Sequence, residues 1–283
     1  MSEPPEMEFT GERFTPECVR EMAYEHWHRY AWAAELVVGK QVLDAACGEG
    51  YGARILADRA DSVIGVDVDT ATIEHARTRY RHPGLRFEAA DCTRLPLADD
   101  SVDVVVSFET LEHLVEHDVL LAEFRRVLRP QGFLVLSSPD KRAYSDETGY
   151  DNPFHLRELY RDELEALLAR HFPAFRLFGQ KLMFVSALWP LEGQGEVSWL
   201  THEADSITAT PQPGLAPLYF LALAAADASN LPATPAASLY GDREESVYAH
   251  YNDEVRKHIR AGHLLAERDR EIAELRARLD AAE

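Results

Sequence analysis

Hydrophobic and polar positions follow two alternating patterns over the first 140 residues. Short apolar runs, which suit strands buried on both faces of a sheet, alternate with segments whose apolar residues recur every three or four positions, as in amphipathic helices. The alternation predicts an α/β fold with a parallel, doubly wound sheet, on which ligands bind beyond the carboxyl ends of the strands. The predicted strands are Gln41–Ala46, Ser62–Val68, Leu85–Ala90, Val102–Phe108 and Gly132–Ser137, and the predicted helices are Pro16–Val38, Ala53–Arg59, Thr70–Tyr80 and Glu112–Leu128.

The alternation is less regular beyond residue 138. The pattern there predicts a helix at Phe154–His171 and strands at Phe175–Ala187 and Pro217–Ala226. The segment between these strands, 188–216, has no clear periodicity, and a connection of that length is usually functional. From Val247 the chain is typical of one charged helix. Its apolar residues recur at seven only twice, which favours a solvated helix over a coiled coil.

Composition narrows the classes of partner. The 283 residues include 29 Lys and Arg against 49 Asp and Glu, for a formal charge of −20. A surface this acidic repels phosphate backbones and anionic lipids. Neither nucleic acid nor a membrane surface is therefore an expected partner. Cys18, Cys47 and Cys92 show no paired spacing, and the Cys/His spacings typical of metal sites are missing, so no metal is expected.

The apolar segments indicate the expected compartment. The N-terminus, MSEPPEMEFTGERF, opens an irregular lead-in over residues 1–16; it is acidic and lacks the apolar core of a signal peptide. The longest apolar run, Leu215–Ala226, is too short to span a bilayer and is interrupted by Pro217. We therefore expect a cytoplasmic protein.

A glycine turn, VLDAACGEGYG, follows the first predicted strand. Glycines between a buried strand and a helix let a ligand approach the backbone, and the helix N-terminus offers N–H groups and partial positive charge. The run GEGYGA also satisfies the dinucleotide pattern, with Asp67 about 20 residues further on to hold a ribose. By itself the turn therefore leaves a nicotinamide-dependent oxidoreductase or epimerase open.

Three aspartates at strand ends favour a different ligand. Asp44 lies inside the end of the first strand, where a carboxylate disfavours a pyrophosphate and favours an ammonium group. Asp67 ends the second strand and can accept ribose hydroxyls, and Asp91 ends the third and can accept an adenine amino proton. A ligand with a ribose, an adenine and a cationic amino-acid tail satisfies all three, and S-adenosylmethionine is such a ligand.

Four ordered motifs carry a resemblance to a known family. The runs VLDAACGEGYG, VIGVDVD, DCTRLPLADDSVDVVVSFETLEHL and EFRRVLRPQGFLVLSSP resemble those of class I S-adenosylmethionine-dependent methyltransferases, of the type 11-like group. The resemblance implies a Rossmann-like, doubly wound, seven-stranded sheet, here with a C-terminal helical extension. One departure is Ala46, where the family often has glycine.

The resemblance also implies roles for individual residues. The methionine end of the cofactor would be surrounded by Asp44, Ala46, Gly48 and Gly50, and the ribose and adenine by Asp67, Val68, Asp91 and Cys92. The sulfonium would lie beside Phe108 and Glu109, and the carboxylate would be covered by Arg29 or Tyr30 of the first helix. For Arg29 the alternative is a side chain that faces water from an amphipathic helix.

The residue pattern and the resemblance together divide the chain into four expected parts. Residues 1–40 form an N-terminal cap helix region, and 41–226 form the S-adenosylmethionine-binding methyltransferase domain, with 188–216 as an insertion over the acceptor. Residues 227–246, rich in alanine and proline, read as a linker, and 247–283 form the charged helix. This last helix offers a surface through which a homo-oligomer could form.

Two histidines are candidates for catalysis. Methyl transfer requires positioning, plus a base when the acceptor is a hydroxyl, and histidine is the usual base near neutral pH. His113 follows the fourth strand in ETLEHL, and His155 lies in NPFHLREL. The alternatives are a helix-packing role for His113 and local bonding at a helix start for His155. Asp151–Asn152 could ligate a metal but suits a turn before Pro153 better.

A narrower resemblance suggests the acceptor. The runs TGERFTPE, EHWHRYAWA, SFETLEHL and NPFHLREL resemble a bacterial subgroup associated with polysaccharide and glycosylated-metabolite biosynthesis. This implies O-methylation of a sugar hydroxyl on a glycan or glycosylated small molecule. An N- or C-methyltransferase of a natural product, and a non-catalytic scaffold with the same fold, remain alternatives.

Overall fold

A computed structural model describes residues 14–16, 18, 21–193, 195, 197–203 and 206–282. Most of the expected lead-in, residues 1–16, therefore lies outside the described residues. The chain forms two compact units, Met1–Leu239 and Tyr240–Glu283. Among the described helices, none combines the length and apolar character that crossing a membrane would require.

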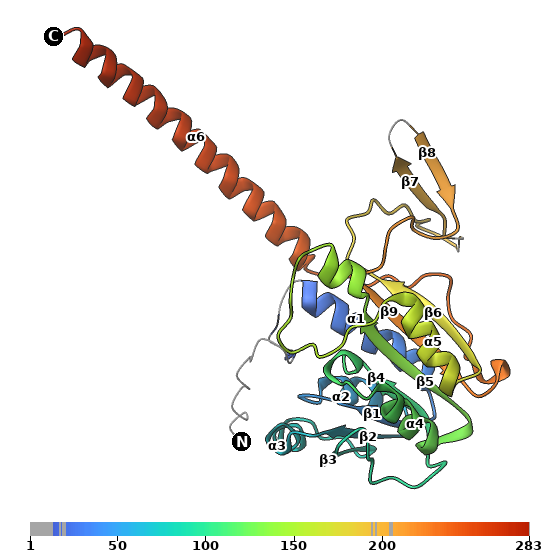
Figure 1. The fold of residues 1–283 in the computed structure, drawn as a ribbon. Coiled ribbons are helices and arrows are strands. Elements are labelled where there is room, and N and C mark those ends of the chain that lie inside the picture. The colour runs from blue at the N-terminus through green and yellow to red at the C-terminus, as the bar shows by residue number, and fades with distance from the viewer. Residues whose placement is uncertain are drawn as a thin grey trace. The chain divides into compact units, whose positions relative to one another are not determined.

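The first unit is built on a seven-stranded sheet with the order β3-β2-β1-β4-β5-β9-β6 (Figure 1). The first five strands are parallel, whereas β9 runs antiparallel to its neighbours β5 and β6. This confirms the predicted Rossmann-like, seven-stranded fold. The strands are β1 Gln41–Ala45, β2 Ser62–Asp67, β3 Leu85–Ala89, β4 Val102–Ser107, β5 Leu128–Pro139, β6 Ala174–Gln180 and β9 Tyr219–Ala225.

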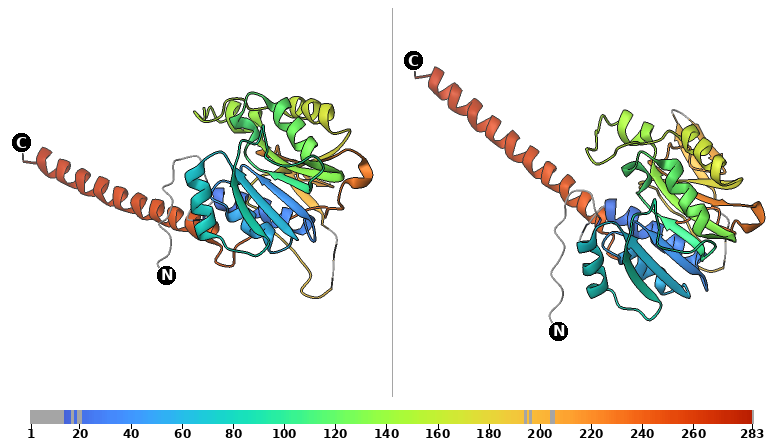
Figure 2. Two further views of the ribbon diagram at one scale, coloured as in Figure 1. Left: turned by 90° about the horizontal axis from the view of Figure 1, so that it is seen from below. Right: turned by 60° about the horizontal axis from the view of Figure 1, so that its bottom comes forward.

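Helices cover both faces of this sheet (Figure 2). Successive side chains of β4 lie on opposite faces of the sheet. Val105 packs with helices α4 and α5, and Val104 and Val106 pack with α1, α2 and α3. Burial on both faces explains why the strand sequences are continuous apolar runs. The helices are α1 Glu21–Leu36, α2 Tyr51–Ala57, α3 Thr70–Arg79, α4 His117–Val127 and α5 Arg161–His171.

Two predicted helices are shorter than the pattern indicated. The predicted helix Glu112–Leu128 is a 3₁₀ turn, η1 (Leu111–His113), followed by α4, and in Phe154–His171 only the part from Arg161 is helical. One contact joins the two segments. The Glu112 carbonyl accepts the N–H groups of Leu156 (2.8 Å) and Arg157 (3.0 Å), whereas in a continuous helix it would accept the N–H group four residues further along its own segment.

The connection between β6 and β9 contains a hairpin that the sequence did not predict. Strand β6 ends at Gln180, short of the predicted Ala187, and β7 (Trp199–Glu203) pairs antiparallel with β8 (Ser206–Thr210). Leu200 and Ile207 are 70% and 69% exposed. A hairpin without a buried face has no hydrophobic alternation for a pattern search to detect. Short segments elsewhere are η2 Arg142–Asp146 and η3 Ala228–Asn230.

The second unit contains α6, Ser246–Asp280, a helix of 35 residues. Its heptad-spaced Leu265, Ile272 and Leu279 are all exposed within the chain. The predicted C-terminal helical extension is thus present.

Gly52 in α2 is required by the close approach of the Tyr30 ring, which a Cβ at this position would overlap. We therefore expect Gly52→Ala to lower the free energy of unfolding by about 1–3 kcal/mol through overpacking, measured by thermal or urea unfolding. Gly262→Ala is the matched control, because Gly262 lies in exposed α6 with open space around it, and alanine there favours the helix. Equal stability of Gly52→Ala and the parent would contradict this packing.

Candidate functional site

The glycine turn after β1 has an unusual backbone. Ala46, Gly48 and Gly50 have φ values of 58°, 53° and 98°, all in the left-handed region. A Cβ on Gly50 would also lie 2.9 Å from the Phe87 ring. Glycine is therefore required at 50, and Ala46 adopts a conformation that glycine would adopt more easily, which accounts for the family's usual residue at this place.

Asp44 lies at the base of this turn with no exposed surface. The Tyr30 hydroxyl donates to its Oδ1 at 3.1 Å, while Oδ2 is buried without a hydrogen-bond partner among the described residues. Burial raises the pKa of Asp44 to about 8. A buried carboxylate oxygen that still lacks a donor fits a cationic ligand, as the sequence predicts for an ammonium group.

Asp67 ends β2 beside the same turn. Its Oδ2 accepts the Gly48 N–H and its Oδ1 accepts the Asp69 N–H, both at 3.0 Å. These bonds orient the carboxylate, and each oxygen keeps a second lone pair for a ribose hydroxyl. The next residue, Val68, is 74% exposed and offers an apolar surface beside it.

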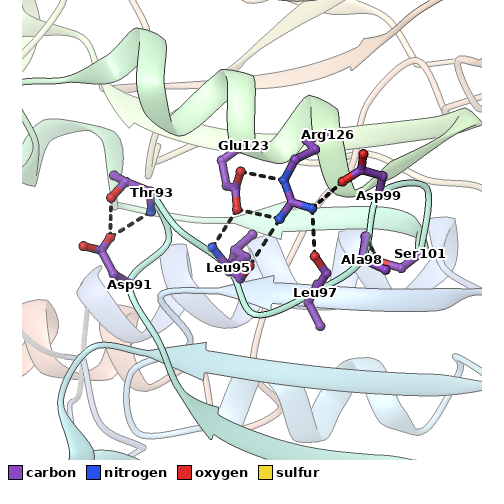
Figure 3. A network of polar contacts seen from close by, with 9 residues as sticks. All are labelled: Asp91, Thr93, Leu95, Leu97, Ala98, Asp99, Ser101, Glu123 and Arg126. Atoms are coloured by element: carbon purple, nitrogen blue, oxygen red, sulfur yellow. Dashed lines mark hydrogen bonds and ion pairs between the residues drawn. The ribbon is translucent and has the colours of Figure 1, made fainter.

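Asp91 and Cys92 begin the loop after β3, and a polar network holds the rest of that loop against α4 (Figure 3). Arg126 donates to the carbonyls of Leu97 (2.8 Å) and Leu95 (3.2 Å), and Glu123 accepts the Leu95 N–H at 2.6 Å. The Oδ1 atom of Asp91 accepts from the backbone and hydroxyl of Thr93. The network therefore fixes the loop at the edge of the sheet where an adenine is expected.

Cys47 and Cys92 are both buried. Burial raises the pKa of Cys92 to about 12 and that of Cys47 well above its ordinary value. A buried thiol that stays protonated is inert at neutral pH.

Arg29 of α1 is 1% exposed, so the alternative of a water-facing arginine is wrong. Its Nε donates to Gln180 Oε1 at 2.6 Å, its Nη1 lies 3.3 Å from Glu109 Oε1, and its guanidinium carbon lies 4.3 Å from the centre of the Tyr219 ring. Its Nη2 is buried without a hydrogen-bond partner among the described residues. This donor can still bind a ligand carboxylate.

Phe108 and Glu109 follow β4 directly. Phe108 packs edge-on against Tyr30, with ring centres 5.0 Å apart. Glu109 has φ of 49°, and its Oε1 accepts the Ser137 hydroxyl at 2.6 Å. Left-handed backbone at a residue with a long side chain is strained, and such strain is concentrated at functional sites. Glu109 thus joins Arg29 to the ends of β4 and β5.

The structure brings His113 and His155 together, with ring centres 5.1 Å apart. His113 Nδ1 lies 3.0 Å from the Phe154 carbonyl, and His155 Nδ1 lies 2.6 Å from Glu158 Oε1. Both partners are acceptors, so each Nδ1 carries the proton and each Nε2 is the basic nitrogen of the neutral ring. Tyr144 stacks on His155 and also contacts Tyr219, which connects the pair to Arg29.

Three other histidines bond to side chains away from this pair. His26 bonds the Tyr51 hydroxyl at 3.1 Å, His28 bonds Ser238, and His171 pairs with Asp118. Asn152 Oδ1 accepts the Phe154 N–H at 3.0 Å, which fits the turn expected at Pro153, and Asp151 is exposed.

Sequence reasoning missed several residues of the site. Glu158 could have been found, because it stands three residues after His155 in HLRE. Gln180, Tyr219 and Tyr144 carried no signal, since they come from segments that only the fold brings together.

Comparisons with known proteins agree on the class. A family model described as a methyltransferase domain matches residues 43–136. Over 170 residues the chain is 43% identical to a Mycolicibacterium smegmatis protein named as an S-adenosylmethionine-dependent methyltransferase, covering 58% of this chain and 65% of the relative. A Mycobacterium tuberculosis protein of the same designation is 42% identical, covering 58% and 61%. The chain thus spans less than two thirds of these two relatives.

A third relative is matched over more of its length. The phthiotriol/phenolphthiotriol dimycocerosates methyltransferase 1 of Mycobacterium ulcerans is 33% identical over 193 residues, covering 61% of this chain and 70% of that protein. Among solved structures, a chain of the complex between the Haloferax volcanii Trm112 methyltransferase activator and a methyltransferase has a TM-score of 0.53 at 20% identity, covering 72% and 92%. The last likeness concerns the fold.

Proposed function

The chain belongs to the class I S-adenosylmethionine-dependent methyltransferases, and from that premise we propose that it methylates a hydroxyl group of a glycan or a glycosylated small molecule. Membership favours the methyltransferase interpretation over a nicotinamide oxidoreductase. The site residues and the acceptor are part of the proposal.

The residues present fit the cofactor of this family. Oδ2 of Asp44 would accept the ammonium group, and Nη2 of Arg29 would donate to the carboxylate of the same amino-acid tail. The oxygens of Asp67 would accept the ribose hydroxyls, and Val68, Asp91 and Cys92 would surround the adenine. The bound cofactor supplies an electrophilic methyl group on a cationic sulfur.

The observation that carries the proposal is the imidazole pair with an oriented base. Glu158 holds the proton on Nδ1 of His155, at 2.6 Å, and so presents Nε2 as the proton acceptor. A sugar hydroxyl is too weak an acid to attack without losing its proton, whereas an amine attacks through its own lone pair. An oriented base therefore favours an oxygen acceptor over nitrogen.

The name of one relative supports an alcohol acceptor. The Mycobacterium ulcerans relative is named for phthiotriol, and a triol offers hydroxyl groups. The same name includes dimycocerosates, so a lipid-linked alcohol is the second candidate for this chain. The exposed apolar residues Leu188, Trp189 and Leu191 favour an acceptor with an apolar part.

Methyl transfer from isotopically labelled S-adenosylmethionine to a panel of acceptors tests the proposal. The panel should hold simple glycosides, oligosaccharides, lipid-linked sugars and matched amines. We expect label on oxygen, recognised by the chemical shift of the new methoxy carbon in NMR spectra. Label found on nitrogen or carbon alone would contradict the proposal.

Cofactor affinity should depend on pH through Asp44. Because its pKa is about 8 without ligand, this carboxyl is mostly protonated at neutral pH, and a cationic ammonium favours its ionised form. Binding should therefore release a proton, and affinity should rise by up to about tenfold per pH unit as pH rises toward about 8. Calorimetric titration of S-adenosylhomocysteine in buffers of different ionisation heat measures this. Asp44→Asn should abolish the slope, and a flat profile in the parent would contradict the assignment.

A further inference from the structure

Glu112, His113 and His155 form a cluster of metal-ligating side chains at the acceptor end of the site. Their potential ligand atoms all lie within 4.8 Å of one another. Glu112 is 1% exposed, so its carboxylate faces the protein interior. We propose that these three residues bind one divalent transition-metal ion. The role of the ion rests on the proposed function, but its binding does not.

Both imidazoles are oriented as metal ligands usually are. A ligating histidine commonly donates its second ring N–H to a carboxylate or a backbone carbonyl, which fixes the tautomer and the ring. His155 Nδ1 lies 2.6 Å from Glu158 Oε1, and His113 Nδ1 lies 3.0 Å from the Phe154 carbonyl. The Nε2 atoms of the two rings are therefore the ligating nitrogens.

The two segments that supply the ligands are tied together by backbone bonds. The Glu112 carbonyl accepts the N–H groups of Leu156 and Arg157, immediately after His155. Glu158 also accepts the Ser145 hydroxyl at 2.6 Å, which holds the carboxylate that orients His155. These bonds hold the two ligand segments together, and binding a shared ion would bring ligand atoms that lie within 4.8 Å of one another to roughly 3–3.5 Å.

The donor set selects the class of metal. Two imidazoles and one carboxylate suit Zn²⁺, Co²⁺ and similar borderline ions, whereas Mg²⁺ and Ca²⁺ prefer oxygen ligands. Three protein ligands leave coordination positions open, as in catalytic metal sites. An acceptor hydroxyl bound there would lose its proton more readily, because a divalent ion lowers the pKa of a bound oxygen. The ion would then replace a free imidazole as the group that activates the acceptor.

Cobalt titration of the chelator-treated 283-residue chain tests this inference, with binding measured by the visible absorption of Co²⁺ bound to nitrogen ligands. We expect one Co²⁺ per chain, displaced by Zn²⁺ and not by equal Mg²⁺. His113→Gln and Glu112→Gln should each weaken binding by at least about tenfold, and Glu158→Gln by about 10- to 100-fold through loss of ligand orientation. His263→Gln, in exposed α6, is the matched control and should bind like the parent.

The outcomes separate this inference from the proposed function. Absent Co²⁺ binding, unchanged affinity in the His113 and Glu112 variants, or equal displacement by Mg²⁺ would each overturn the inference. Methyl transfer to hydroxyls at full rate in a chain that binds no ion would overturn it while leaving the proposed function intact. An ion bound through these residues, with the methyl group delivered to nitrogen, would support the inference and contradict the proposed function.

Discussion

Replacing Asp67 with alanine should weaken S-adenosylmethionine binding by at least about 100-fold. Each hydrogen bond to a charged group is worth about 1.5–3 kcal/mol, and two ribose hydroxyls would be lost together. The substitution also removes the acceptor for the Gly48 N–H, at 3.0 Å, so the glycine turn loses a contact that positions it. Calorimetric titration with S-adenosylmethionine measures the loss.

Two further variants isolate the effect at Asp67. Asp67→Asn keeps the shape and one acceptor oxygen, and should retain part of the affinity. Asp58→Ala removes an exposed carboxylate of an i,i+4 ion pair with Arg54, and should bind like the parent. If Asp67→Ala stays within about twofold of the parent, the ribose assignment is wrong.

Replacing His155 with glutamine should lower kcat for a hydroxyl acceptor by about 10²- to 10⁴-fold, the range of a general base, while the cofactor affinity is unchanged. The reason is that Nε2 of His155, in an imidazole held by Glu158, either accepts the hydroxyl proton itself or ligates the ion that takes over this role. His113→Gln should also lower kcat, because its ring lies beside that of His155. Single-turnover rates with saturating cofactor measure the chemical step.

A matched histidine provides the control for these rates. His171 also pairs with a carboxylate, Asp118, but on the surface. His171→Gln should therefore leave kcat unchanged. Unchanged kcat in both the His113 and the His155 variants would contradict a role for the pair in proton removal. It would favour catalysis by positioning alone, as for an amine acceptor.

The sheet could be predicted because its strands are buried on both faces. VDVVVS reads as a continuous apolar run since Val105 and Val106 pack on opposite layers. The exposed hairpin β7–β8 lacks that pattern and could not be predicted. The false helix at Phe154–Tyr160 has apolar spacing like that of α5, but its amides bond to Glu112 across the chain, a tertiary contact that no local pattern contains.

The candidate site divides in the same way. Asp44 and Asp67 were identifiable because the end of a strand already places a residue at the ligand edge of a parallel sheet. Glu158 and the pairing of His113 with His155 depend on a loop returning past η1, so only the folded chain reveals them. Arg29 was named from the sequence, but the choice between the site and a water-facing position needed the fold, since its buried partners Gln180 and Tyr219 lie on the last strands.

The antiparallel insertion of β9 between β5 and β6 has a consequence for the growing chain on the ribosome. In the sheet, β6 pairs with β9, and β9 closes the edge of β5. Until Tyr219–Ala225 emerges, the nascent sheet ends at the open backbone edge of β5, and β6 lacks β9, the strand with which it pairs. Unpaired edges of this kind invite pairing with other chains. We therefore expect fragments truncated before residue 219 to aggregate and to require chaperones, even though every residue proposed to touch the cofactor has already been synthesised.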